Sequence, residues 1–502
     1  MGRDNSGITR RLVLGALLAA PGAALAEAPL RSIRPEPRGG RPPAEARRVA
    51  ARQAEAIVAE AGLGGRVAFA VADARTGALL GASGAGEAMP PASVTKAITA
   101  LYAAESLGPG HRFRTQLIAT GPVANGRIDG DLVLAGTGDP TLNTDSLATM
   151  AARLRDAGIR EVRGWFRVYG GALPFVRSID PGQPDHVGYN PAISGLNLNF
   201  NRVHFEWRRA GGNWQVAMDA RSERLRPAVT VARMRIADRR SPLYTYDDRE
   251  GVDDWTVAGP ALDRDGSRWL PVRRPAEYAG EVFQVLARSY GIVLRHPEAT
   301  QGPPRGTVLV DHVSDDLTTV LTDMLKWSTN ITAEVVGLTA SATRGGAPGS
   351  LAASGARMAD WLRGRTAING ARFVDHSGLG PDSRITPEDM VAALVHSGPD
   401  GALRRMLKRI DMTDSNGRPL RNHPARVVAK TGTLNFVSGL AGYIQGPSNA
   451  VLAFAVFAAD LDRRRRLSPE EMERPDGGRG WTQRARAMQQ KLIERWVTVH
   501  GA

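Results

Sequence analysis

The pattern of predicted secondary structure changes twice along the chain, and this limits the folds that the chain can adopt. Residues 106–304 combine short strand-like segments with many turns, whereas the flanking segments show helical periodicity and longer strands. We expect helices at 44–62, 93–107, 314–327, 331–342, 350–365, 387–396 and 481–498, and strands at 66–72, 78–82, 426–430, 437–444 and 450–458. The sequence therefore predicts an α/β plus β protein. Its α/β domain (44–105 and 305–502) would be split by a mainly β insertion (106–304) of two nested domains, with the opening hairpin and the last three strands in one sheet.

Composition narrows the chemistry. The 502 residues contain no cysteine, which excludes disulfides, thiolate zinc sites and a cysteine nucleophile. The nine histidines are dispersed, without a carboxylate cluster around one, and no Gly-Lys-Ser/Thr follows the glycine-containing stretch 136–139, so neither a metal nor another cofactor is expected. The net charge of +14 comes from scattered arginines without a nucleic-acid motif, so we expect no nucleic-acid partner. Anionic cell-wall peptides, or a solvated surface without a partner, would account for the charge.

Lysine is rare in this chain. Only five of the 65 basic residues are lysines, namely Lys96, Lys326, Lys408, Lys430 and Lys491. Arginine stays protonated in proteins, whereas a buried lysine can become neutral. A lysine retained among so many arginines is therefore a candidate for a role in which the amine loses its proton.

The N-terminus has the pattern of a secretory signal. Arg10 and Arg11 precede a short apolar stretch from Leu12 to Leu25, and a small-x-small cleavage site ends at Ala26. The apolar stretch is too short for a spanning helix, although a membrane anchor left in place is the alternative. We predict a cleaved signal peptide at 1–26, a flexible lead-in at 27–43 and export to a bacterial periplasm. The route stays open, because the arginine pair also resembles a twin-arginine signal.

The first motif with chemical content is Ser93-Val94-Thr95-Lys96. Three residues are nearly one helical turn, so the hydroxyl and the amine face the same way. A serine at a helix N-terminus lies beside free backbone N–H groups, and a desolvated lysine can accept its proton. The alternative is a helix-capping serine followed by a surface lysine.

The second motif is Ser328-Thr329-Asn330, between two predicted helices. A hydroxyl there can relay a proton, and an amide can hold a substrate carbonyl. An ordinary cap or turn would explain this motif equally well.

The third motif, Lys430-Thr431-Gly432-Thr433, ends a β-branched run. A glycine in an edge strand allows a ligand backbone to approach closely, and a lysine with two hydroxyls suits a carboxylate. The alternative is a hairpin turn with a surface lysine.

Together and in this order, the three motifs resemble the Ser-x-x-Lys, Ser-x-Asn and Lys-Thr-Gly set of penicillin-binding proteins and serine β-lactamases. The long interval from Ser93 to Ser328 is similar to that of class C low-molecular-mass penicillin-binding proteins, the D-alanyl-D-alanine carboxypeptidase/endopeptidases. Stretches 138–142, 199–201 and 375–379 agree with that family. Thr329 and His376 depart from its commoner Asp and Gly.

The resemblance implies a fold and a reaction. The fold would be the transpeptidase-like three-layer α/β/α sandwich with an all-α subdomain. Ser93 would attack the carbonyl between two D-alanines and form an acyl-enzyme, with Lys96 taking its proton. Ser328 would pass a proton to the leaving nitrogen, and the N–H groups of Ser93 and Thr433 would bind the oxyanion. Water would release the shortened peptide, whereas a penicillin would stall there.

The resemblance also implies how substrate is held. Asn330 would bind the substrate amide, and the strand Lys430, Thr431, Gly432 and Thr433 would bind the peptide and its carboxylate. The expected partners are peptidoglycan stem peptides and β-lactams, with at most peripheral membrane contact. A serine β-lactamase or esterase, or a non-catalytic cell-wall-binding protein, are the alternative functions. The motifs leave open the balance between carboxypeptidase and endopeptidase action, and the oligomeric state.

Overall fold

The computed structural model describes residues 53–366, 370–414, 417–468 and 471–501. The predicted signal peptide and lead-in lie outside these residues, as does the first part of the helix expected at 44–62; residues 53–60 are helical. Among the described helices, none has both the length and the apolar character needed to cross a membrane.

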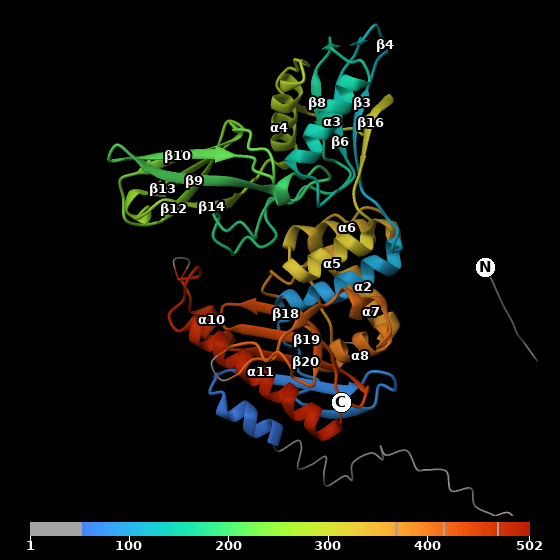
Figure 1. Cartoon of the computed structure of the whole chain (residues 1–502), viewed down its shortest axis with the longest axis vertical. Helices are drawn as coiled ribbons and strands as arrows, with labels where there is room; N and C mark the ends of the chain where they lie inside the picture. Colours follow the sequence, from blue (N-terminus) through green and yellow to red (C-terminus); the bar gives the residue numbers. More distant parts are fainter. Residues whose placement is uncertain (1–52, 367–369, 415–416, 469–470, 502) are drawn as a thin grey trace, which may run out of the picture. The chain divides into compact units, whose positions relative to one another are not determined.

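One antiparallel sheet unites the two ends of the chain, as the sequence predicts. Its order is β17-β18-β19-β20-β1-β2, and Figure 1 labels β18, β19 and β20 within it. The strands are β17 (Lys408–Ile410), β18 (Arg426–Leu434), β19 (Val437–Gln445), β20 (Val451–Ala459), β1 (Arg66–Asp73) and β2 (Leu79–Ser83). The expected hairpin is thus β1–β2, and β1 pairs with β20 from Arg66↔Ala459 to Asp73↔Leu452.

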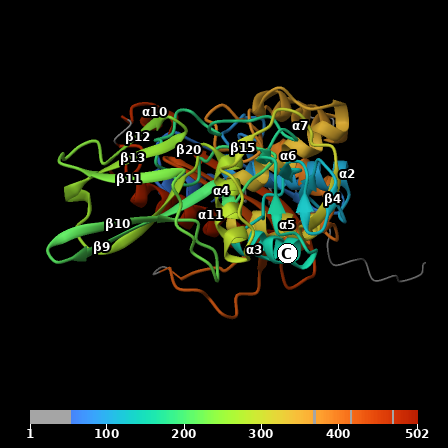
Figure 2. The ribbon, with the colours of Figure 1, turned by 90° about the horizontal axis from the view of Figure 1, so that it is seen from above.

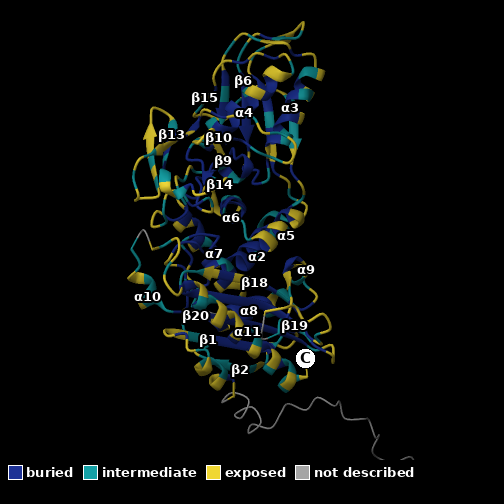
Figure 3. Cartoon of the chain, turned by 60° about the vertical axis from the view of Figure 1, so that its left-hand side comes forward, coloured by how far each residue is buried: buried dark blue, intermediate teal, exposed yellow. Residues whose placement is uncertain are grey.

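Alternating side chains show why this sheet is covered on both faces. In β20, Leu452, Phe454 and Val456 belong to one apolar core, together with α11 (Gly478–His500). The intervening Ala453, Ala455 and Phe457 belong to another, together with α2 (Thr95–Leu107) and α8 (Pro387–Ser397). Because strand side chains alternate between faces, a continuously buried strand requires a helical layer on each side. Figure 3 shows this buried sheet between its helices, so the α/β expectation is confirmed.

Further helices pack around α2. They are α5 (Leu317–Trp327), α6 (Asn330–Gly345), α7 (Leu351–Thr366) and α9 (Ala402–Met406), and their apolar faces share one core with α2. The chain passes from α5 into α6 through residues 328 and 329 alone, so the second motif is the connection between two packed helices.

The insertion contains four smaller sheets. Their orders are β15-β8-β6-β3-β16, β4-β5-β7, β10-β9-β14 and β11-β13-β12. The strands are β3 (Arg114–Ala119), β4 (Val123–Ala124), β5 (Arg127–Ile128), β6 (Leu132–Gly136), β7 (Glu161–Val162), β8 (Phe166–Tyr169), β9 (Arg202–Ala210), β10 (Asn213–Asp219), β11 (Ala232–Ala237), β12 (Tyr244–Arg249), β13 (Val252–Ala258), β14 (Gly266–Pro271), β15 (Glu298–Ala299) and β16 (Thr307–Val313). Two helices accompany them, α3 (Thr144–Asp156) and α4 (Pro275–Ser289).

The sheets of β9 and β13 share one apolar core, which includes Phe205 of β9 and Trp255 of β13. Both sheets lie side by side in Figures 1 and 2. The insertion also extends past its expected end at residue 304, because β16 pairs with β3 as an edge strand. The chain completes this sheet before it enters α5, so the boundary falls at about residue 313 instead of 305.

Candidate active site

Ser93 lies at the turn that leads into α2. It belongs to a short 3₁₀ turn, Ala92–Val94, and α2 begins directly after it. Lys96, one turn later, is fully buried, and its Nζ lies 2.9 Å from Ser93 Oγ. No side-chain cap forms at this helix start. The geometry therefore differs from the alternative of a capping serine and a surface lysine.

The Lys96 amine is held by three acceptors. Besides Ser93 Oγ, its Nζ lies 2.7 Å from Asn330 Oδ1 and 2.8 Å from the backbone oxygen of Ser377. Burial lowers the pKa of Lys96 to about 7, although the negative charges of Glu334 and Asp375 act in the opposite direction and raise it. A neutral Lys96 can donate two hydrogen bonds and still offer its lone pair to the Ser93 hydroxyl, which is what a proton acceptor requires.

Two buried carboxyl groups shape this neighbourhood: Asp375, which belongs to the 375–379 stretch singled out in the sequence, and Glu334, which the sequence analysis missed. Glu334 accepts hydrogen bonds from the backbone N–H groups of His376 (2.9 Å) and Ser377 (2.8 Å). Asp375 accepts from Gly378 N (2.8 Å) and Gly380 N (2.6 Å). Burial, and then the Asp375 charge, raise the pKa of Glu334 to about 8. The hydrogen bonds of Glu334 and Asp375 together fix the 375–380 turn, which presents the backbone oxygen of Ser377 to Lys96. The only signal for Glu334 in the sequence was its position one helical turn after Asn330.

His376, the departure from the family pattern, packs away from Ser93. Its ring lies against Gly337, where an added Cβ would come within 2.1 Å of His376 Cγ. Its Nε2 lies 2.7 Å from Ser354 Oγ, and the ring stacks on Tyr102 at 6.3 Å between centroids. Burial lowers the pKa of His376 to about 3, so the imidazole is neutral at physiological pH. The histidine is accommodated because a glycine faces it.

The second motif brings its two polar ends to the same place. Ser328 ends α5 in the left-handed conformation (φ 59°), and Asn330 begins α6. Ser328 Oγ lies 2.9 Å from Lys430 Nζ. The Asn330 side chain accepts a hydrogen bond from Lys96 through Oδ1. Its Nδ2 donates to the backbone oxygen of Tyr189 at 2.9 Å. The insertion thereby supports the site through Tyr189, a contact that the sequence did not indicate.

The third motif forms the free edge of the main sheet. β17 pairs only with residues 427–429 of β18, which leaves the edge open from Lys430 onward. Lys430 is 1% exposed and its Nζ donates to the Thr431 oxygen at 2.7 Å, so the peptide group of Thr431 faces that edge. Peptide groups two residues apart on a strand point the same way, so the N–H of Thr433 faces the open edge as well.

Gly432 allows a close approach, although of a different kind from the one expected. A Cβ at Gly432 would lie 2.5 Å from the Pro91 oxygen and 3.1 Å from the Ser93 nitrogen. The chain segment that needs this space is the Ser93 turn itself and not a ligand. Gly432 thus sets the distance between the β18 edge and the proposed nucleophile.

A cavity of about 950 Å³ opens over these groups. Ser93, Ser328, Asn330 and Thr433 line it, whereas Lys96, Lys430 and Gly432 lie behind its wall and Thr431 is exposed outside it. Four further lining residues are arginines from α10 (Leu461–Arg465), from the segment that follows it and from the first half of α11: Arg464, Arg474, Arg479 and Arg486. The carboxylate that lines the cavity, Glu473, is already paired with His186 (2.9 Å) and Arg268 (2.8 Å). The cavity is therefore suited to an anionic ligand.

Thr329 has no place in this cavity. It lines a second cavity on the other side of the α5–α6 connection, together with Trp327. The side chain of the middle residue of the motif thus faces away from Ser93.

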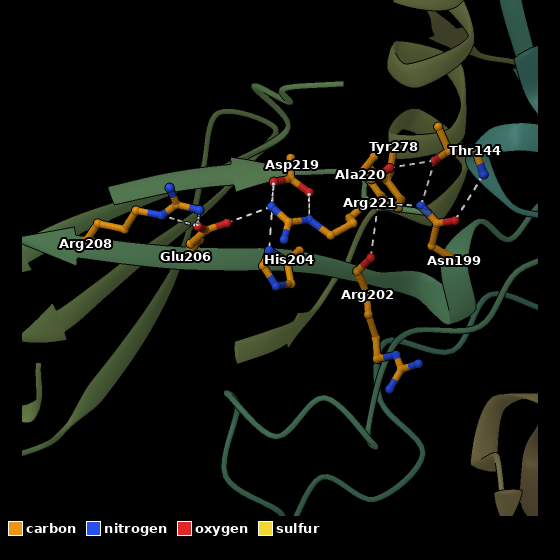
Figure 4. Close-up of polar contacts among 10 residues, drawn as sticks. All are labelled: Thr144, Asn199, Arg202, His204, Glu206, Arg208, Asp219, Ala220, Arg221 and Tyr278. Carbon is orange, nitrogen blue, oxygen red and sulfur yellow. Dashed lines mark hydrogen bonds and ion pairs between the residues drawn. The ribbon is translucent and has the colours of Figure 1, made fainter. Parts of the chain in front are cut away.

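The expectation that no carboxylates surround a histidine is wrong for His204. The β9–β10 hairpin places Asp219 opposite His204, with Glu206 nearby, a set of groups that could hold a metal ion (Figure 4). However, Arg221 Nη2 lies 2.7 Å from Glu206 and 2.9 Å from Asp219. A guanidinium already occupies the position of a cation, so we interpret the cluster as an ion-pair network.

Comparison with known proteins identifies the family. Residues 50–473, most of the chain, match the profile of the D-Ala-D-Ala carboxypeptidase 3 (S13) family. The chain belongs to the S13 family. A D-alanyl-D-alanine carboxypeptidase of Actinomadura sp. (strain R39) is 29% identical over 435 residues, covering 80% of this chain and 79% of the relative. This S13 protein is thus a hydrolase, and the expected resemblance and serine D-Ala-D-Ala carboxypeptidase class are confirmed.

Solved structures agree with the S13 fold. Penicillin binding protein 4 (dacB) from Haemophilus influenzae superposes with a TM-score of 0.69 at 20% identity, over 81% of this chain and 93% of that chain. The same protein complexed with a novel β-lactam gives a TM-score of 0.66 at 20% identity, over 81% and 92%. At this identity the likeness establishes the fold of this S13 member.

Proposed function

We propose that this S13 protein removes the terminal D-alanine from peptidoglycan stem peptides through an acyl-enzyme on Ser93. The observation that carries the proposal is the 2.9 Å contact between Ser93 Oγ and a buried lysine amine whose pKa is lowered to about 7. A hydroxyl becomes a competent nucleophile when an adjacent base can remove its proton.

The reaction can be written with the groups present. Ser93 Oγ bonds to the carbonyl carbon between the two D-alanines as Lys96 takes the hydroxyl proton. The oxyanion accepts hydrogen bonds from the N–H groups of Ser93 and Thr433. The C–N bond then breaks as the proton taken up by Lys96 passes through Ser328 to the leaving nitrogen, which leaves Lys96 neutral again. Water attacks the ester while Lys96 takes one of its protons. Return of that proton to Ser93 Oγ restores the hydroxyl and releases the shortened peptide.

Substrate binding uses the free edge of β18. An extended peptide can add to this edge as an antiparallel strand, and its main-chain hydrogen bonds supply affinity. Lys430 is behind the cavity wall, so we assign it an electrostatic role, exerted through Ser328 and Thr431, with the hydroxyl of Thr433, which lines the cavity, contacting the terminal carboxylate. Burial and the charges of Lys96 and Lys408 lower the pKa of Lys430, and a bound carboxylate would favour its charged form.

The proposal extends to place and partners. The N-terminal signal pattern favours export, so we propose that the protein acts in the periplasm after signal cleavage and that β-lactams acylate the same serine. The four arginines in the cavity favour substrates with several carboxylates. The cavity volume also favours endopeptidase action on cross-linked peptides as a second activity.

The first experiment locates the nucleophile. Benzylpenicillin should add its mass to the peptide that contains Ser93, and Ser93→Ala should abolish both this adduct and D-alanine release from a pentapeptide. Mass spectrometry reads the adduct, and Ser438→Ala, at a buried serine on β19, serves as the control with the adduct retained. An adduct on another residue, or undiminished labelling of Ser93→Ala, would show that Ser93 is not the nucleophile.

The pH dependence tests the base. Lys96 must be neutral to accept a proton, so the acylation rate should be low below its pKa and rise with pH through a midpoint near 7. Because Glu334 titrates in the same buried group, the midpoint belongs to the set and not to Lys96 alone. Stopped-flow acylation between about pH 5.5 and 9 measures it, with circular dichroism confirming an intact fold. A rate that stays flat or falls as pH rises toward 8 contradicts the assignment.

A further inference from the structure

The cavity behind the second motif has the features of a separate binding site. Its volume is about 660 Å³, and it shares one turn of chain with the active site. Trp327 and Thr329 line this second cavity, whereas Ser328 and Asn330 line the catalytic one. A ligand in the second cavity would therefore lie against the far side of the Ser328 connection.

Arg202 supplies an unpaired cation to this cavity. Its guanidinium lies between two aromatic rings, 5.2 Å from the Phe200 centroid and 5.4 Å from the Trp269 centroid. Its Nε is buried without a hydrogen-bond partner, and among the described residues no carboxylate pairs with it. Figure 4 shows the side chain extending away from the ion-pair network of Arg221 on the same hairpin. A sheltered guanidinium without a partner is suited to a carboxylate from outside the chain.

The rest of the lining complements a zwitterion. Asp315 and Asp323 are exposed carboxylates in the cavity wall, and in the described part of the chain neither forms an ion pair. Hydroxyl groups of Thr141, Ser146 and Thr332 line the space between loops and helices, and Trp327, 66% exposed, adds an aromatic face. The cavity thus offers one unpaired cation, two unpaired anions and several hydrogen-bonding groups.

We propose that this cavity binds the amino-acid end of a peptidoglycan component, with its carboxylate on Arg202 and its ammonium group toward Asp315 and Asp323. The identity of the ligand rests on the proposed function, because stem peptides and their products are what this enzyme meets. Two sources share the chemistry: the free end of a diamino acid in a second stem peptide, and the D-alanine that the reaction releases. Both carry a carboxylate and an ammonium group on one carbon atom.

Calorimetric titration of the full mature chain tests the proposal with two probes. One is the tripeptide L-Ala-γ-D-Glu-meso-diaminopimelate, which has no D-Ala-D-Ala bond to cleave; the other is D-alanine. Wild type should bind at least one probe, and Arg202→Gln should weaken that binding by about tenfold or more, as expected for loss of a charge-assisted pair. Arg209→Gln, on the same strand and stacked on Trp214, should change it by less than about twofold. Binding of only one probe identifies the source.

The remaining variants separate this cavity from the catalytic one. Lys430→Gln should leave probe binding intact. Loss of binding in Lys430→Gln with retention in Arg202→Gln would place the probe in the catalytic cavity and overturn the proposal, as would no binding of either probe. If Arg202→Gln fails to fold, the exposed Asp323→Asn decides, since it should weaken binding by about threefold or more. D-Alanine release from a pentapeptide is assayed separately, so failure of the proposed function is distinguishable from failure of this site.

Discussion

Replacing Lys96 with arginine should slow acylation by benzylpenicillin by about 10²–10⁴-fold, the usual contribution of a positioned general base. Lys96 is fully buried, and its pKa of about 7 lets it become neutral near physiological pH. Arginine keeps its proton under the same conditions, so it cannot accept one from Ser93. The second-order acylation constant, with circular dichroism for each variant, measures the loss.

Two matched lysine variants complete this test. Lys430→Arg should lose less, about 10–10²-fold, since its proposed role is a positive charge, which arginine retains in a wider side chain. Lys491→Arg should acylate like wild type, because Lys491 is exposed on α11 and pairs only loosely with Glu60 at 3.4 Å. If Lys96→Arg acylates as fast as Lys430→Arg, Lys96 is not the proton acceptor.

Replacing Gly337 with alanine should destabilise the protein by about 3 kcal/mol, near the upper end of the usual cost of overpacking a core. The new Cβ would fall 2.1 Å from Cγ and 2.3 Å from Nδ1 of the His376 ring, which is itself buried between α6 and Tyr102. The ring would have to leave its contact with Ser354, and the 375–380 turn would move with it. Urea unfolding followed by circular dichroism measures the change.

A double-mutant cycle assigns this effect to the histidine. His376→Gly removes the ring, so Gly337→Ala should cost about 1–3 kcal/mol less in that background. Gly345→Ala, in the same helix, is the control: the atoms nearest to its Cβ would be those of the Arg357 guanidinium at 3.7–3.9 Å, so it should be neutral or slightly stabilising. Equal costs of Gly337→Ala in both backgrounds would contradict the packing argument.

Much of the fold could be predicted from the sequence. Continuous apolar runs predict strands such as β20. The hairpin before Ser93 pairs with β20 because the backbone N–H and C=O groups of both strands need hydrogen-bond partners. The limits of the insertion were less accurate. Whether β16 pairs with β3 or joins the following helices depends on which edge is unoccupied, and no local pattern records that.

The order Ser93-x-x-Lys96, Ser328-x-Asn330 and Lys430-Thr431-Gly432 was enough to assign the family and to nominate the site, since spacing within a helical turn or a strand is a local property. Only the tertiary structure decided what surrounds these groups. Glu334 accepts hydrogen bonds from backbone N–H groups that are distant in the sequence, and the backbone oxygen of Tyr189 accepts one from the distant Asn330 side chain. Gly432 and Gly337 matter because of what packs on them. Burial sets the pKa of Lys96, and burial is a property of the assembled core and not of the residues beside it in the chain.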